Sequence, residues 1–110
     1  MSTIVNVEQT AFQLILHAGN AKSSLMEAMQ AARAGNLDEA HSKIEEAKVE
    51  LNHAHHAQTS LIQGEARGEK VELNILLIHA QDHLMNALTM RELVTEIIHL
   101  HEKINKKIIE

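Results

Sequence analysis

Seam positions spaced three and four residues apart recur along the chain, and they are clearest in its middle third. There the seam consists of Leu37, Ala40, Ile44, Ala47, Leu51, Ala54, Gln58 and Leu61. This heptad-like spacing is typical of a helix that packs nearly antiparallel to its neighbours at a shallow crossing angle. In the first third, the candidate core positions are Val5, Phe12, Ile15, Leu16, Gly19, Leu25, Met26 and Met29. The pattern therefore predicts long helices that share one core.

Two glycine-containing breaks divide this pattern. Gly35 suits the position that ends a helix with a positive φ, Asn36 suits the N-cap of the next helix, and Glu39 stands where a capping box places its carboxylate. The second break contains Gly64 and Gly68 among charged residues, and we expect the second helix to end near Gly68. The predicted helices span about residues 6–34, 37–66 and 70–107. Short connections make them an antiparallel, up-down-up three-helix bundle, so the predicted fold class is all-α.

Composition narrows the classes of function. The chain has 110 residues, which fits one domain spanning 1–110, and it has no proline to interrupt a helix. The absence of cysteine excludes disulfides, zinc–thiolate sites and a thiol nucleophile. An aromatic content of 1% and a net charge of -5 argue against nucleic acid as a partner. No signal-peptide pattern or membrane-length apolar run is present, so we expect a cytoplasmic protein without direct membrane insertion.

The third helix is apolar on nearly all sides between residues 75 and 90. At about 100° per residue, one face carries Ile75, Leu76, His79, Asp82, His83, Asn86, Met90, Leu93 and Ile97. The opposite face carries Leu77, Leu84 and Leu88, with Ile78 and Met85 at its edges. A bundle of three helices covers only one stripe of each member. We therefore predict a homo-oligomer with this helix at its centre; the alternative is a third helix wrapped by the other two.

Four polar side chains interrupt the first of these faces: His79, Asp82, His83 and Asn86. Their spacing places them on one side of the helix, and each group left unpaired costs roughly 1–3 kcal/mol. Such a violation of the pattern indicates a functional position. Three interpretations remain open: hydrogen bonds that fix helix register, a metal site, or a neutral imidazole that acts as a nucleophile toward phosphorus.

The other histidines carry weaker signals. His53, His55 and His56 lie close together in the second helix, where we expect a solvated or interface-edge cluster, with incidental metal binding as the alternative. No partner pattern is evident for His17, His41, His99 and His101.

Three segments of the chain resemble one known family. The segment LLIHAQDHLM (76–85) is similar to the signature of the lactose/cellobiose-type IIA component of the bacterial sugar phosphotransferase system. ILHAGNAKS (15–23) and AHHAQTSLIQGEARG (54–68) resemble further parts of that family, in the same order. The resemblance implies a subunit of three helices that assembles as a homotrimer, a nine-helix bundle.

The resemblance also implies an activity. Such a protein is a phosphotransferase that accepts a phosphoryl group from the histidine-containing phosphocarrier protein and passes it to a cysteine of a sugar-specific IIB component. The IIB component phosphorylates a disaccharide that enters through a membrane component. The run AQDHLMNA favours a cellobiose or chitobiose type over lactose. The alternative function is a non-catalytic, metal-binding helical oligomer with a structural or regulatory role.

Residue roles follow from the same resemblance. His79, and not His83, corresponds to the phosphohistidine, with the phosphoryl group on Nε2. Asp82 corresponds to the ligand of a divalent cation shared on the trimer axis, usually Mg²⁺. Binding of a cation at this position has a physical explanation, because carboxylates gathered on an axis repel one another unless a cation lies between them. His83, one turn on, is the expected supporting donor to a phosphoryl oxygen, and Gln81 is a second if its side chain reaches round.

Overall fold

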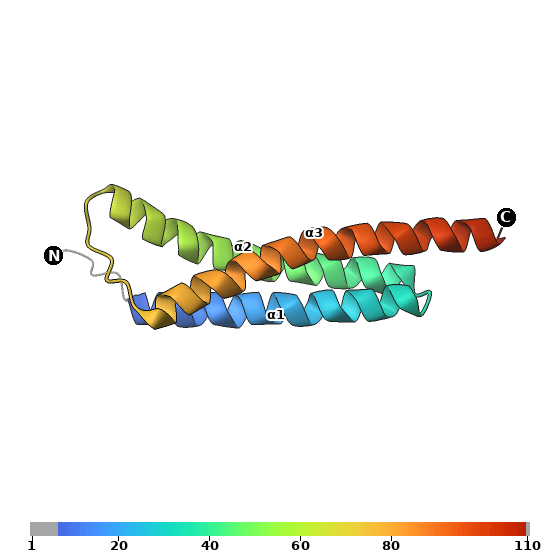
Figure 1. Cartoon of the computed structure of the whole chain (residues 1–110), viewed down its shortest axis with the longest axis horizontal. Coiled ribbons are helices and arrows are strands. Elements are labelled where there is room, and N and C mark those ends of the chain that lie inside the picture. Colours follow the sequence, from blue (N-terminus) through green and yellow to red (C-terminus); the bar gives the residue numbers. More distant parts are fainter. Residues whose placement is uncertain (1–6, 110) are drawn as a thin grey trace.

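The chain folds into three α-helices joined by two short connections (Figure 1). The structure is a computed structural model, and it describes residues 7–109. The helices are α1 (Val7–Arg33), α2 (Leu37–Ala66) and α3 (Ile75–Ile109). They run up, down and up, so that α1 and α3 are parallel and α2 is antiparallel to both. The predicted all-α, antiparallel three-helix bundle is confirmed, and its shape is a rod of 65 × 20 × 19 Å.

The turn between α1 and α2 forms where a glycine permits a left-handed backbone. Gly35 has φ 87°, its N–H donates to the carbonyl of Ala32 at 3.0 Å, and the N–H of Asn36 donates to that of Ala31 at 2.8 Å. This pair of bonds is the Schellman arrangement. Asn36 is the N-cap residue of α2, as predicted, but its side chain makes no cap hydrogen bond. Its ψ of 72° lies outside the extended region from which a cap side chain reaches forward, so the capping box with Glu39 is also missing.

α2 ends in the same way, near the predicted glycine. Gly68 has φ 86°, its N–H donates to Glu65 at 3.0 Å, and the N–H of Glu69 donates to Gly64 at 3.1 Å. Two similar helix ends therefore fix the lengths of α1 and α2.

α3 begins later than the pattern indicates, at Ile75 instead of residue 70. The Oδ1 atom of Asn74 accepts a hydrogen bond from the N–H of Leu77 at 2.7 Å, and the carbonyl of Asn74 accepts one from Ile78. Asn74 is thus the N-cap. The apolar residues Val71 and Leu73 extend the apolar pattern N-terminal to this cap, which hides it in the sequence.

The core lies along α1, which contacts both other helices more closely than they contact each other. The predicted seam of α2 is confirmed, since each of its members is buried or half-buried. The seam of α1 is confirmed only in part. Leu25 is buried, and Ile15 and Met29 pack against the core. Phe12 and Leu16 are instead each 56% exposed, and Met26 is 46% exposed. The core positions of α1 are Ala11, Leu14, Ala18, Ala21, Leu25, Ala28, Ala31 and Ala32. Small side chains let two neighbouring helices approach α1 at once. Val5, also expected in this seam, lies outside the described residues.

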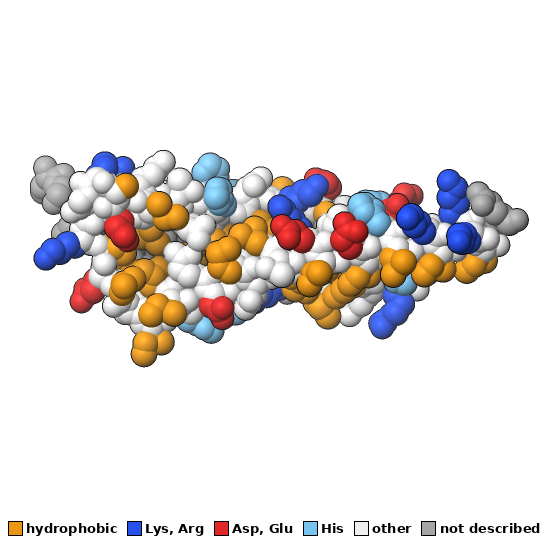
Figure 2. Space-filling view, turned by 45° about the horizontal axis from the view of Figure 1, so that its top comes forward, with side chains coloured by type: hydrophobic (Ala, Val, Ile, Leu, Met, Phe, Trp, Pro, Cys, Tyr) orange, Lys and Arg blue, Asp and Glu red, His pale blue; other side chains and the backbone are white. Residues whose placement is uncertain are grey.

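α3 buries one face and exposes the other. Its inner face packs into the core through Leu77, Ala80, Leu84, Ala87, Val94 and Ile98. The exposed face, here called the outer stripe of α3, consists of Ile75, Ile78, Met85, Leu93, Leu100, Ile104 and Ile108. Figure 2 shows hydrophobic side chains in a row along the C-terminal part of the molecule. The prediction of leftover apolar surface is confirmed, and Ile78 and Met85 belong to it instead of the opposite face. Within residues 7–109, no helix has the length and apolarity that a bilayer span requires.

Candidate functional site

His79 and His83 form a contacting pair on the flank of α3. Their Nε2 atoms lie 3.1 Å apart, and their rings meet edge-on with centroids separated by 4.5 Å. The spacing of four residues on one helix brings the rings together, as the sequence predicts. His79 is exposed and His83 is half-buried. At this distance one ring nitrogen donates a hydrogen bond and the other accepts it.

A lysine from another helix completes this cluster. Lys22 of α1 places its Nζ atom 3.0 Å from Nδ1 of His83. Burial lowers the pKa of the His83 imidazole, the charges of Lys22 and His79 lower it further, and Asp82 acts in the opposite direction. The neutral form of His83 is therefore favoured. Sequence reasoning missed Lys22, because no local pattern shows which residue of α1 faces His83.

Asp82 lies apart from the histidine pair. It is exposed, and on a helix it is displaced by about 60° from His79, which places it within the outer stripe between Ile78 and Met85. Residues 7–109 contain no group of three or more His, Asp or Glu side chains placed to hold a metal ion. One chain therefore does not gather His79, Asp82 and His83 around an ion. The carboxylate of Asp82 is a hard oxygen donor of the kind Mg²⁺ prefers.

Gln81 lies on the α2 side of α3. Its Oε1 atom accepts a hydrogen bond of 2.7 Å from Nε2 of Gln58, a member of the α2 seam. At two residues from His79, it is rotated about 200° around the helix. The structure thus brings His83 to His79 and directs Gln81 to α2. Asn86, the fourth polar residue of the predicted face, is exposed.

A second histidine pair joins α1 and α2. The rings of His17 and His53 stack with centroids 5.0 Å apart, and Nδ1 of His17 lies 2.6 Å from Oε2 of Glu50. The hydrogen bond with His17 is the main cause that lowers the pKa of the Glu50 carboxyl. No spacing in the sequence indicates this pair, because its members lie on different helices. His53, His55 and His56 are all exposed on this chain, as a solvated or interface-edge cluster would be, and His53 also stacks on His17.

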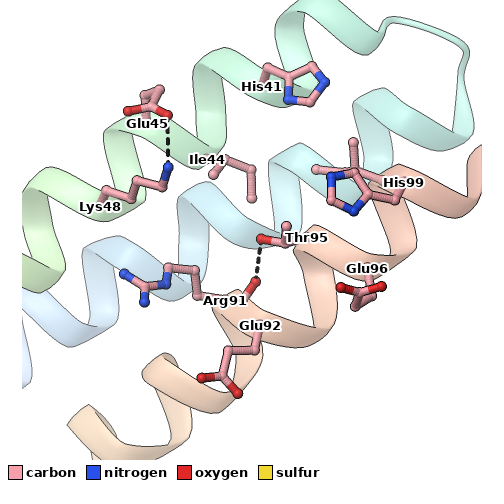
Figure 3. Close-up of a pocket in the computed structure, with 10 residues that line it drawn as sticks. His41, Ile44, Glu45, Lys48, Arg91, Glu92, Thr95, Glu96 and His99 are labelled. Carbon is pink, nitrogen blue, oxygen red and sulfur yellow. Dashed lines mark hydrogen bonds and ion pairs between the residues drawn. The ribbon is translucent and has the colours of Figure 1, made fainter. Parts of the chain in front are cut away.

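A groove of about 480 Å³ lies between α2 and α3, away from this site (Figure 3). Its lining residues are His41, Ile44, Glu45, Lys48, Arg91, Glu92, Thr95, Glu96, Ile98 and His99. Lys48 pairs with Glu45 at 3.0 Å, and the Thr95 hydroxyl donates to the carbonyl of Arg91. The α3 residues of this groove begin about 18 Å along the helix from His79. The groove therefore contributes nothing to the histidine pair.

Comparison with known proteins adds independent findings. A family model described as "PTS system, Lactose/Cellobiose specific IIA subunit" matches residues 9–102. The lichenan-specific phosphotransferase enzyme IIA component of Bacillus subtilis is 54% identical, over 92% of each chain. The crystal structure of the cellobiose-specific enzyme IIA of Bacillus anthracis has a TM-score of 0.91 and 54% identity, and covers 96% of each chain. The IIA(Chitobiose)–HPr complex of the Escherichia coli N,N'-diacetylchitobiose branch has a TM-score of 0.79 and 37% identity, over 93% of this chain and 99% of that one.

Proposed function

The chain belongs to the lactose/cellobiose-specific IIA family and is a phosphotransferase component of the sugar phosphotransferase system, and from this premise we propose that it carries the phosphoryl group on Nε2 of His79. The donor is the histidine-containing phosphocarrier protein, and the acceptor is a cysteine of a sugar-specific IIB component. The exchange takes place in the cytoplasm. One observation carries the proposal: His79 is exposed to a partner, while His83 lies 3.1 Å from its Nε2 atom.

The first step is an in-line exchange between two imidazole rings. The lone pair of His79 Nε2 attacks phosphorus of the donor phosphohistidine, and a new N–P bond forms. The donor's N–P bond breaks, and its electron pair stays on the donor ring nitrogen. Negative charge spreads over the equatorial phosphoryl oxygens, so positioned donors contribute most of the catalysis. His83, whose Nε2 atom lies 3.1 Å from that of His79, is the donor that we propose for one of these oxygens.

The second step moves the same group to the IIB component. A thiolate of that partner attacks phosphorus, the N–P bond on His79 breaks, and the bond's electron pair returns to Nε2. Gln81 has no part in the proposed donor set, because it lies toward α2 and pairs with Gln58. Both partners use the same exposed histidine in turn, so each should bind weakly and briefly.

The sugar class follows from the relatives. Several proteins similar to this chain are named for lichenan, cellobiose and chitobiose. We propose that the chain serves uptake of a β-linked disaccharide of the cellobiose or chitobiose type. The chain itself need not touch the sugar, because its two partners receive and deliver only the phosphoryl group.

Assembly is the third part of the proposal. The outer stripe of α3 exposes seven large apolar residues, more than a monomer leaves uncovered without a reason. A homotrimer built on this stripe covers it and brings three Asp82 carboxylates to one axis. Like charges gathered in that way need a cation, and one Mg²⁺ per trimer suits the oxygen donors. When bound, the ion supplies charge balance for assembly, while transfer depends on the histidines.

The largest expected effect comes from removing the nucleophile. His79→Ala should abolish labelling by the radiolabelled, phosphorylated phosphocarrier protein, because the proposed nucleophile is removed. Wild-type label should be labile in acid and stable in base, as phosphohistidine is and phosphoserine is not. The matched control is His17→Ala, a histidine of the second pair, which should label normally.

Label that persists on the His79→Ala protein would disprove the assignment. A wild-type protein that takes no label but trimerises and binds Mg²⁺ would instead favour the alternative, a non-catalytic, metal-binding helical oligomer.

A further inference from the structure

Three side chains from two helices form one continuous line at the proposed site. Nζ of Lys22 lies 3.0 Å from Nδ1 of His83, and Nε2 of His83 lies 3.1 Å from Nε2 of His79. Lys22 and His83 are both half-buried, and they are 61 positions apart in the chain. Only the parallel packing of α1 on α3 brings them together.

We propose that Lys22 is a positioning residue that fixes the tautomer of His83 and, through it, presents the lone pair of His79 Nε2. A lysine ammonium donates hydrogen bonds and accepts none. Nδ1 of His83 must therefore accept, so the single ring hydrogen of neutral His83 is on Nε2. That N–H donates to Nε2 of His79, which must then be the unprotonated nitrogen of its ring.

This inference rests on the proposed function and explains which nitrogen reacts. Before transfer, the His83 N–H holds the His79 ring by its lone pair. During transfer, His79 Nε2 forms the bond to phosphorus, the donor's N–P bond breaks, and the His83 N–H turns from that nitrogen to a phosphoryl oxygen. No proton is transferred between Lys22, His83 and His79, so each of the three side chains keeps its hydrogens throughout the step.

The partner of Lys22 distinguishes it from other lysines of the bundle. Lys43 pairs with Glu27 at 3.0 Å, and Lys48 pairs with Glu45 at 3.0 Å. The hydrogen bond that the structure describes for Lys22 instead goes to a neutral imidazole. A positive charge at one end of a hydrogen-bonded line polarises it and strengthens the donor at the other end. Lys22 therefore makes His83 a better donor to a developing phosphoryl charge.

The test combines a spectroscopic and a kinetic readout on the full chain. In ¹⁵N-labelled protein, long-range ¹H–¹⁵N spectra distinguish the two tautomers of each histidine. Wild-type His83 should carry its hydrogen on Nε2, and Lys22→Met should raise the share with hydrogen on Nδ1. Lys22→Arg, which still donates, should keep the wild-type tautomer. Circular dichroism verifies that the variants are folded, and Met preserves the apolar stem.

The kinetic arm follows label transfer from the phosphorylated phosphocarrier protein to His79 in a single turnover. Lys22→Met should slow transfer about tenfold at saturating donor, as loss of a residue that fixes a histidine tautomer typically does. Half-saturation should be unchanged, and Lys22→Arg should restore most of the rate. The control is Lys43→Met, which removes a cation and an α1–α2 ion pair but leaves the site intact.

Each outcome decides one question. A slow Lys22→Met protein with an unchanged His83 tautomer overturns the inference, because Lys22 would then act directly on the phosphoryl group or the partner. Normal transfer by Lys22→Met also overturns it. A wild-type protein that takes no label overturns the proposed function itself, whereas labelled wild type with unaffected Lys22 variants leaves that function standing.

Discussion

Two histidine pairs lie in the same bundle with opposite electrostatic neighbours. His79 and His83 meet edge-on at 4.5 Å, and the ammonium of Lys22 faces the pair. His17 and His53 stack at 5.0 Å, and the carboxylate of Glu50 faces that pair. Ring spacing alone does not separate them, but the charge beside each pair does.

The neighbouring charge decides what a ring nitrogen can do. A cation beside His83 leaves its Nδ1 as an acceptor and disfavours protonation, so a lone pair and an N–H are presented in a fixed order. The carboxylate of Glu50 beside His17 accepts a hydrogen bond from the ring N–H. The arrangement at His79 and His83 suits a nucleophile with a supporting donor. The arrangement at His17 and Glu50 suits a contact that holds α1 against α2.

The difference between the two pairs is tested most strongly by truncating the supporting histidine of each pair. His83→Ala should slow phosphorylation of His79 about 100-fold without abolishing it, because one donor to the phosphoryl oxygens is lost while the nucleophile remains. Single-turnover label transfer measures the rate. His53→Ala, the matched change in the other pair, should stay within about twofold of wild type. Equal rates for the two variants would contradict the division of roles.

Asp82, outside both histidine pairs, tests what holds the proposed trimer together. Asp82→Leu should keep the trimer and, without divalent cation, raise its stability by about 1 kcal/mol per chain, or roughly 4–8 °C in Tm. The reason is that like charges on the axis give way to apolar packing. Sedimentation and melting with and without a chelator measure both effects, and the wild type should respond to the chelator while the variant does not. Monomers in the variant alone would show that the cation, and not the outer stripe, holds the assembly.

The smallest expected effect concerns the Glu50 side of the comparison. Glu50→Gln should lower the free energy of unfolding by about 1 kcal/mol near neutral pH, since a charge-assisted bond to His17 is weakened. The folded pKa of Glu50 is lowered, so this contribution is present above the ordinary glutamate pKa and is lost as pH falls through the folded value. Urea unfolding at about pH 7 and about pH 3 measures the gap, which is the difference in free energy of unfolding between wild type and Glu50→Gln.

The gap between wild type and Glu50→Gln should close at the lower pH, and phosphorylation of His79 should be normal. Glu45→Gln is the control, because its ion pair with Lys48 is exposed and contributes little. A gap that is the same at both pH values would contradict a stabilising charge-assisted hydrogen bond between His17 and Glu50.

The parts of the fold that local pattern governs could be predicted. The α2 seam was correct because its three-and-four spacing contrasts clearly with the polar residues between. The α1 seam was correct only in part, at positions such as Leu25. Most core positions of α1 are alanine, which gives little hydrophobic contrast beside Phe12 and Leu16. The start of α3 depends on one side-chain bond of Asn74, and the apolar residues before it gave no reason to expect a cap.

The candidate site divides in the same way. The contact of His79 with His83 follows from a spacing of four on one helix, and the family resemblance indicated which of them to propose as the phosphohistidine. Lys22 with His83, and His17 with Glu50, are pairs separated by 61 and 33 positions. Such pairs depend on how two helices are aligned along each other, which residue spacing within one helix does not specify.

The C-terminal turns of α3 project past the turn between α1 and α2 (Figure 1). His41, near the start of α2, pairs with Glu102, and most side chains beyond that point are exposed. These turns need no separate helix nucleation, because they extend a helix that already packs in the bundle. Each added residue, however, gains only the marginal free energy of helix propagation. With little else in the same chain to pack against, this end is expected to fray when the chain is alone. Its helix content should therefore follow the association state of the chain more closely than the stability of the bundle.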